Sequence, residues 1–177
     1  MNDLVEFTNA STGFCCSDEI TLVFPPVCTK EEYECDKNLC HTYRGRNMKL
    51  NTVLASRCSV TFNCVIKNIF ATLVSDEAST YTDDFLMKIK NCVCLFDART
   101  IYIPYEKEYE CVNNLIWRSV YDCHRNSVST YAKYHLGKTK CYKKCSIQMI
   151  EMMREMGVEW EEQPLHFKYG IYAKKEL

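Results

Sequence analysis

Glycine, proline and long hydrophobic runs are scarce in this sequence. Five glycines and four prolines among 177 residues exclude a collagen-like, linker-like or low-complexity chain. Because no uninterrupted apolar run is long enough to cross a bilayer, we expect no transmembrane segment and no membrane partner. The first residues, Met1 to Glu6, contain neither a basic stretch nor an apolar core, so they do not resemble a secretory signal.

Cysteine, by contrast, is abundant, with 13 residues. Without a secretory signal, this number predicts a reducing, cytoplasmic location in which most cysteines are buried thiols rather than disulfides. A second interpretation is a zinc site in the irregular segment after the hairpin described below. Its ligands would be Cys28, Cys35, Cys40 and His41. Their spacing lacks the close cysteine pairs of structural zinc sites, which favours chance clustering.

Acidic residues are absent from two long stretches of the chain. Residues 37–75 and 123–150 contain no Asp or Glu, and each carries six Lys or Arg side chains. The remainder must then carry −13, because the net charge is −1. This segregation indicates either two solvated helix faces or a basic surface that binds nucleic acid or nucleotide phosphate.

Hydrophobic periodicity predicts an α+β domain in which strands and helices do not alternate regularly. A short helix is expected at the N-terminus, and Pro25-Pro26 should end the second strand of a hairpin. Gly137 and Gly157 are expected to stop helices. The expected helices cover residues 1–9, 47–73, 106–135 and 146–156, and the expected strands cover 14–16, 20–24, 92–96 and 101–103.

Two polar constellations could carry chemistry. Ser17-Asp18-Glu19 lies at the bend between two apolar strands, where paired carboxylates are either ordinary solvated turn residues or ligands for Mg²⁺. Arg118, Asp122 and Asn126 follow at four-residue steps and therefore share one helical face, with Ser119 and His124 beside it. This face is either a salt-bridged helix surface or a polar site.

Four ordered blocks of the chain resemble the tRNA(His) guanylyltransferase superfamily, the reverse polymerases that add nucleotides to the 5′ end of tRNA. The motifs lie closer to the bacterial and archaeal-type branch, which is associated with 5′-end repair. The blocks include Cys16-Ser17-Asp18-Glu19-Ile20, Tyr43-Arg44-Gly45-Arg46 and Phe96-Asp97-Ala98-Arg99. In full they span residues 16–24, 43–63, 96–128 and 149–170.

The resemblance implies a palm-like (ferredoxin-like) polymerase domain with C-terminal helices. Residues 1–177 would form one partial domain, with 1–136 as the palm part and 137–177 as the C-terminal segment. The implied function is templated tRNA 5′-end nucleotidyl transfer, in the form of 3′–5′ addition or repair. Two Mg²⁺ ions and GTP or another nucleoside triphosphate are the implied cofactors, with ATP for activation. tRNA is the implied partner, and the resemblance also implies a homo-oligomer.

The resemblance also implies roles for particular residues. Asp18 would bind the metal, and Asp18 and Glu19 would be the catalytic carboxylates. Ser17, Asp122 and Asn126 would contact the nucleotide. The acid-free stretches, rather than the resemblance, predict the phosphate contacts, and the basic stretch from Arg44 to Arg57 is expected nearer the triphosphate. The residues expected to contact tRNA are Arg125, Lys138, Lys140, Lys143 and Lys144, the last four on a mobile connection.

Two departures from the family pattern qualify these roles. The family has a strand ending in Asp-Gly upstream of the hairpin, and no residue before Asp18 matches it. We therefore expect an N-terminally truncated palm that lacks its first strand and one of two metal-binding aspartates. The alternative function is a non-catalytic, tRNA-binding remnant of such an enzyme. The sequence from His124 to Thr130 departs from the eukaryotic motif, which favours templated repair.

Overall fold

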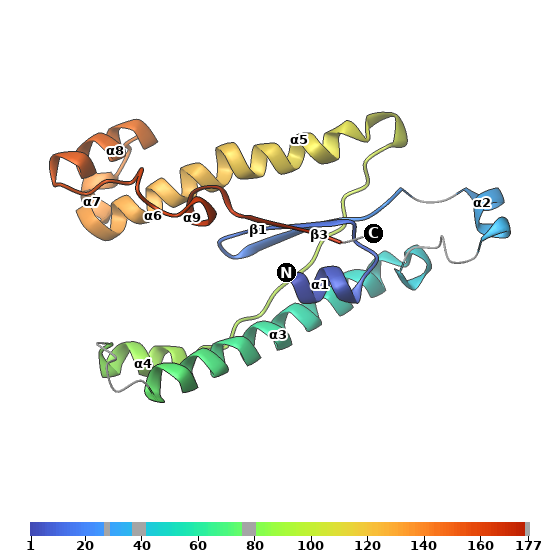
Figure 1. Ribbon diagram of the computed structural model, residues 1–177, viewed down its shortest axis with the longest axis horizontal. Helices are drawn as coiled ribbons and strands as arrows, with labels where there is room; N and C mark the ends of the chain where they lie inside the picture. The colour runs from blue at the N-terminus through green and yellow to red at the C-terminus, as the bar shows by residue number, and fades with distance from the viewer. Residues whose placement is uncertain (27–28, 37–41, 76–80, 176–177) are drawn as a thin grey trace. The chain divides into compact units, whose positions relative to one another are not determined.

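The computed structural model describes residues 1–26, 29–36, 42–75 and 81–175, and it confirms the expected α+β class (Figure 1). The first half contains α1 (Asn2–Phe7), β1 (Thr12–Cys16), β2 (Glu19–Val23), α2 (Lys30–Cys35), η2 (Thr42–Gly45), α3 (Asn47–Ser75) and α4 (Asp83–Lys90). The second half contains η3 (Tyr105–Lys107), α5 (Tyr109–Trp117), η4 (Arg118–Cys123), α6 (His124–Leu136), α7 (Lys138–Cys141), α8 (Ser146–Glu155), α9 (Leu165–Tyr169) and β3 (Ile171–Lys174).

The chain divides into two compact units. Unit 1 consists of residues 1–5, 10–25 and 103–177, and unit 2 consists of residues 6–9 and 26–102. The chain therefore forms the hairpin of unit 1, leaves it to build unit 2, and returns to unit 1 for its last 75 residues. The hairpin and the helices that follow residue 103 belong to the same unit although they lie far apart in the sequence.

The sheet of unit 1 contains β1 between β2 and β3, and both pairings are antiparallel (Figure 1). The predicted hairpin is confirmed, with Phe14 opposite Thr21 in β2 and opposite Tyr172 in β3. Phe14 is only 1% exposed, and its ring centroid lies 4.7 Å from that of Tyr172. Gly170 precedes β3 with φ 79°, and a Cβ there would lie 2.6 Å from the Cys15 carbonyl oxygen. Only glycine therefore permits this close approach of β3 to β1.

A helix runs from α5 through η4 into α6 without a break, as predicted (Figure 1). Helices α6, α7 and α8 supply most of the core, which consists of Val128, Ala132, Leu136, Cys141, Met149, Met153 and Trp160. Gly137 ends α6 with φ 84°, a conformation that favours glycine. Where the sequence predicts a mobile connection, residues 138–141 form the short helix α7, and its Cys141 is buried.

The long helix is confirmed as α3 in unit 2, whereas the strands expected at residues 92–96 and at residues 101–103, where the chain returns to unit 1, do not form. Side chains of α3 bind this segment instead. Asn63 accepts a hydrogen bond from the Cys94 backbone at 2.9 Å, and Ser59 accepts one from the Phe96 backbone at 2.9 Å. Because the helix satisfies these backbone groups, the segment needs no neighbouring strand. Helix α4, whose N-cap is Thr82, was not predicted from the sequence.

Helix α3 also corrects the exclusion of a membrane span. By length and composition alone, this 29-residue helix could cross a membrane, although the chain lacks an uninterrupted apolar run of that length. One such helix is weak evidence, because core helices of soluble proteins and signal sequences meet the same criterion. The contacts from Ser59 and Asn63 to the backbone of residues 94–96 identify a polar side of α3 that binds protein.

Candidate functional site

The tip of the β1–β2 hairpin is a two-residue turn that exposes acidic side chains. Cys16 pairs with Glu19 at the end of the ladder, so Ser17 and Asp18 alone reverse the chain. Ser17 has φ 56°, a left-handed conformation that is uncommon outside glycine and is often found at functional sites. Ser17, Asp18 and Glu19 are all exposed. Within the described residues, the Asp18 carboxylate has no hydrogen-bond or ion-pair partner.

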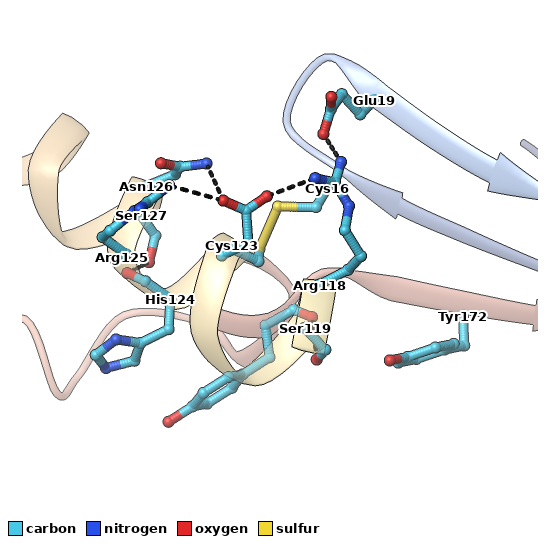
Figure 2. Close-up of a disulfide and its surroundings, with 12 residues drawn as sticks. Cys16, Glu19, Arg118, Ser119, Cys123, His124, Arg125, Asn126, Ser127 and Tyr172 are labelled. Atoms are coloured by element: carbon cyan, nitrogen blue, oxygen red, sulfur yellow. Dashed lines mark hydrogen bonds and ion pairs between the residues drawn. A yellow bond between two sulfur atoms is a disulfide. The ribbon is translucent and has the colours of Figure 1, made fainter. Parts of the chain in front are cut away.

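Arg118 connects this hairpin tip to the helix. Its guanidinium pairs with the Glu19 carboxylate, and its Nη1 lies 2.7 Å from Oδ2 of Asp122 (Figure 2). The Arg118 side chain is 20% exposed and that of Asp122 is 11% exposed, so their attraction is less screened than that of a surface pair. Arg118 thus lies between two carboxylates from different parts of the sequence.

Asp122 accepts hydrogen bonds from three side chains. Besides Arg118, these are Arg125, whose Nη2 lies 3.0 Å from Oδ1, and Asn126, whose Nδ2 lies 3.3 Å from the same oxygen. The residues belong to η4, a π-helical turn, and to the first turn of α6. Such turns often occur at functional sites. The two guanidinium groups pair with Glu19 and Asp122, whereas Asp18 forms no ion pair with a described residue.

Ser119 and His124, which the sequence places beside this polar face, contact the C-terminal segment. Ser119 donates a hydrogen bond to the Tyr169 carbonyl oxygen at 2.7 Å. His124 packs against Trp160, with ring centroids 4.8 Å apart, and points away from Asn126 (Figure 2). Both residues therefore hold the C-terminal segment against the helix. The four-residue steps identified Arg118, Asp122 and Asn126, whereas Ser119 and His124 fall outside that spacing.

A disulfide between Cys16 and Cys123 joins the hairpin to η4 beside these residues (Figure 2). Its cysteines are 107 residues apart, and no local pattern identifies them as partners. The other described cysteines form no disulfide, as expected, but only Cys141 among them is buried. The expectation that most cysteines are buried is therefore wrong for the described part of the chain.

The other predicted site residues lie elsewhere or outside the described residues. Lys138 and Lys140 are on α7, and Lys143 and Lys144 follow in a turn where Lys143 has φ 58°. Of the four residues suggested for zinc, only Cys35 is described, at the end of α2. No cluster of three or more His, Cys, Asp or Glu side chains suited to a metal ion occurs among the described residues.

The comparison with known families decides the relationship. The family model described as tRNA(His) guanylyltransferase matches residues 1–104, more than half of the chain. This chain belongs to that family. The match includes the hairpin with Asp18 and Glu19, and it ends before the helix that carries Arg118 and Asp122.

Two relatives extend the likeness over nearly the whole chain. An uncharacterised protein of Acanthamoeba polyphaga mimivirus is 36% identical over 176 residues, which cover 99% of this chain and 59% of that protein. The structure of a bacterial tRNA(His) guanylyltransferase-like protein in complex with ATP matches with a TM-score of 0.67 and 20% identity. This match covers 96% of the chain and 62% of the bacterial protein, and it supports the palm-like fold. The chain therefore spans about three fifths of the length of both relatives.

Proposed function

We propose that this chain is a tRNA 5′-end nucleotidyltransferase that adds or repairs nucleotides in the 3′–5′ direction. The observation that carries the proposal is the exposed Asp18 carboxylate at the hairpin tip, which has no partner among the described residues and precedes Glu19, the partner of Arg118. Family membership and the fold shared with an ATP-bound bacterial relative support a nucleotide as substrate. GTP or another nucleoside triphosphate is the expected donor.

The hairpin residues are suited to Mg²⁺. Magnesium prefers oxygen ligands and is usually held by one or two carboxylates, with substrate phosphates and water completing its coordination. Asp18 is exposed and has no described partner, so it is the carboxylate available for this role, with Glu19 beside it in support. Bound Mg²⁺ would neutralise the triphosphate and activate the attacking hydroxyl group. We propose that two Mg²⁺ ions take part. Among the described residues, Asp18 would bind a metal ion and Glu19 would support it.

The residues around Asp122 would bind and orient the nucleotide. Arg125 uses Nη2 to hold Asp122, but its side chain is 66% exposed, so other guanidinium donors remain for a phosphate. Asn126 donates its amide to Asp122, which leaves its carbonyl oxygen for a nucleotide donor group. Ser17 contributes an exposed hydroxyl at the turn. Asp122 would act as a positioning residue, since its three partners already use its oxygens.

A direct assay tests the proposed activity. The full chain is incubated with Mg²⁺, a labelled nucleoside triphosphate and a tRNA that lacks its 5′ nucleotide and carries a 5′-triphosphate. We expect label at the 5′ end, opposite a templating base, and none when EDTA is present. Binding of tRNA without incorporation at any Mg²⁺ concentration would contradict the enzyme and favour the alternative, a tRNA-binding remnant.

The proposed tRNA contact is the basic segment on and after α7. Lys138, Lys140, Lys143 and Lys144 form no ion pair within the described residues, so their charges remain available to RNA phosphates. Replacing all four with alanine should reduce the slope of log affinity against log salt by about 0.7 to 0.9 for each RNA phosphate that the lysines neutralise. Binding is measured across a salt series.

The matched control is the double variant Lys88→Ala, Lys90→Ala. These lysines lie in the last turn of α4, and Lys88 already pairs with Asp84. We expect its salt slope to equal that of the unaltered protein. An unchanged slope in the α7 variant would show that its lysines are ordinary solvated side chains.

A further inference from the structure

Cys16 and Cys123 connect residues 10–25 and residues 103–177 of unit 1, which flank residues 26–102 of unit 2 in the sequence. Cys16 ends β1 and Cys123 ends η4, and their Cα atoms are 6.0 Å apart. The 107-residue separation includes all of residues 26–102. A bond at this position closes the loop through which the chain leaves and re-enters unit 1. Such a bond lowers the conformational entropy of the unfolded chain, and the reduction grows with the number of residues in the closed loop.

Each cysteine of this bond is next in sequence to a residue of the proposed site. Cys16 is the residue before the Ser17–Asp18 turn, and Cys123 is the residue after Asp122. Besides the disulfide, the Glu19–Arg118 ion pair joins the hairpin tip to η4, and the Glu19 side chain is 58% exposed. An ion pair with so exposed a carboxylate holds two elements together weakly. The disulfide is therefore the stronger constraint on the position of the tip.

The two cysteines differ in accessibility in a way that permits exchange. Cys123 is 2% exposed, whereas Cys16 is partly exposed, so a small thiol can reach the bond from the Cys16 side. Burial raises the pKa of the neighbouring Cys15 thiol above its ordinary value. Because the thiolate is the attacking form, Cys15 competes poorly for the bond at neutral pH.

We propose that Cys16 and Cys123 are a reversible thiol-modification site that fixes the hairpin tip against η4 when it is oxidised. A small disulfide such as oxidised glutathione accepts two electrons and two protons from the two thiols. The products are the Cys16–Cys123 disulfide and two molecules of reduced glutathione, and excess reduced glutathione reverses the reaction. In the reduced form, the tip with Asp18 separates more often from the Arg118–Asp122 face.

The test uses the full chain in buffers with different ratios of oxidised to reduced glutathione. Free thiols are alkylated, and peptide mapping measures the fraction of linked Cys16–Cys123. Hydrogen exchange of residues 12–23 is followed in parallel. We expect the linked fraction to follow the glutathione ratio, and exchange at the hairpin to become about tenfold faster on reduction. These measurements require neither nucleotide nor tRNA, so their outcome is independent of the proposed function.

Two variants separate this pair from the other cysteines. Cys16→Ser should make hairpin exchange independent of the glutathione ratio, whereas Cys15→Ser should keep the dependence. The proposal would be overturned if Cys16 and Cys123 remain thiols at every glutathione ratio. Linkage that leaves hairpin exchange unchanged would also overturn it. If Cys16→Ser does not fold, the measurements on the unaltered chain across the glutathione ratios still test the proposal.

Discussion

Asp18→Asn is expected to lower nucleotide incorporation by about 1,000-fold, because the proposed Mg²⁺ ion loses its charged oxygen ligand. Stability should change by less than about 0.5 kcal/mol, since Asp18 is exposed and has no partner among the described residues. The measurement is the 5′-labelling assay across a Mg²⁺ series, together with thermal unfolding of the same preparations.

Glu155→Gln is the matched control for this experiment. Glu155 is also exposed, and it lies at the end of α8, away from the hairpin in the sequence. Its variant should keep full incorporation, because it removes a carboxylate charge without touching the proposed site. If Asp18→Asn also keeps full incorporation, Asp18 is a solvated turn residue and the metal role is wrong.

Asp122→Ala is expected to lower the free energy of unfolding by about 3 kcal/mol. The variant leaves Arg118, whose side chain is only 20% exposed, without its partner at 2.7 Å, and it removes bonds to Arg125 and Asn126. For a chain of this size, the melting temperature should fall by roughly 6–12 °C. Thermal unfolding and urea titration measure the change, and the salt dependence should be small because the pair is largely buried.

Asp84→Ala provides the comparison for Asp122→Ala. Asp84 and Lys88 form another pair four residues apart on a helix, but their side chains are 76% and 73% exposed. Asp84→Ala should lower the free energy of unfolding by less than about 0.5 kcal/mol. If Asp122→Ala costs as little as Asp84→Ala, the Arg118–Asp122–Asn126 face is an ordinary solvated helix surface.

Local pattern predicted those features that depend on neighbours in the sequence. Two short apolar runs on either side of Ser17-Asp18-Glu19 gave the β1–β2 hairpin, and four-residue steps gave the Arg118–Asp122–Asn126 face. Periods of two and of 3.6 residues arise from backbone geometry alone, so they are readable without a tertiary structure. Helix α3 was predicted for the same reason.

The local sequence pattern gave the wrong secondary structure where side chains distant in the sequence bind backbone groups. The apolar stretch at residues 92–96 has the composition of a strand, but Asn63 and Ser59 on α3 bind its backbone. β-propensity describes a preference for a half-buried pleated surface, and it does not specify the partner that supplies the hydrogen bonds. The contacts of Ser119 and His124 with residues 160–169 are likewise visible only in the tertiary structure.

The sequence by itself determined the family, the hairpin with its acidic tip and the polar face of the helix. Only the tertiary structure decided that Glu19 pairs with Arg118, that Cys16 bonds with Cys123 and that residues 26–102 belong to a unit other than that of residues 10–25 and 103–177. These contacts join residues about 100 positions apart, and their geometry depends on how β1 packs beside η4 and β3. Spacing along a chain reports only local geometry, so no pattern in the sequence could have specified them.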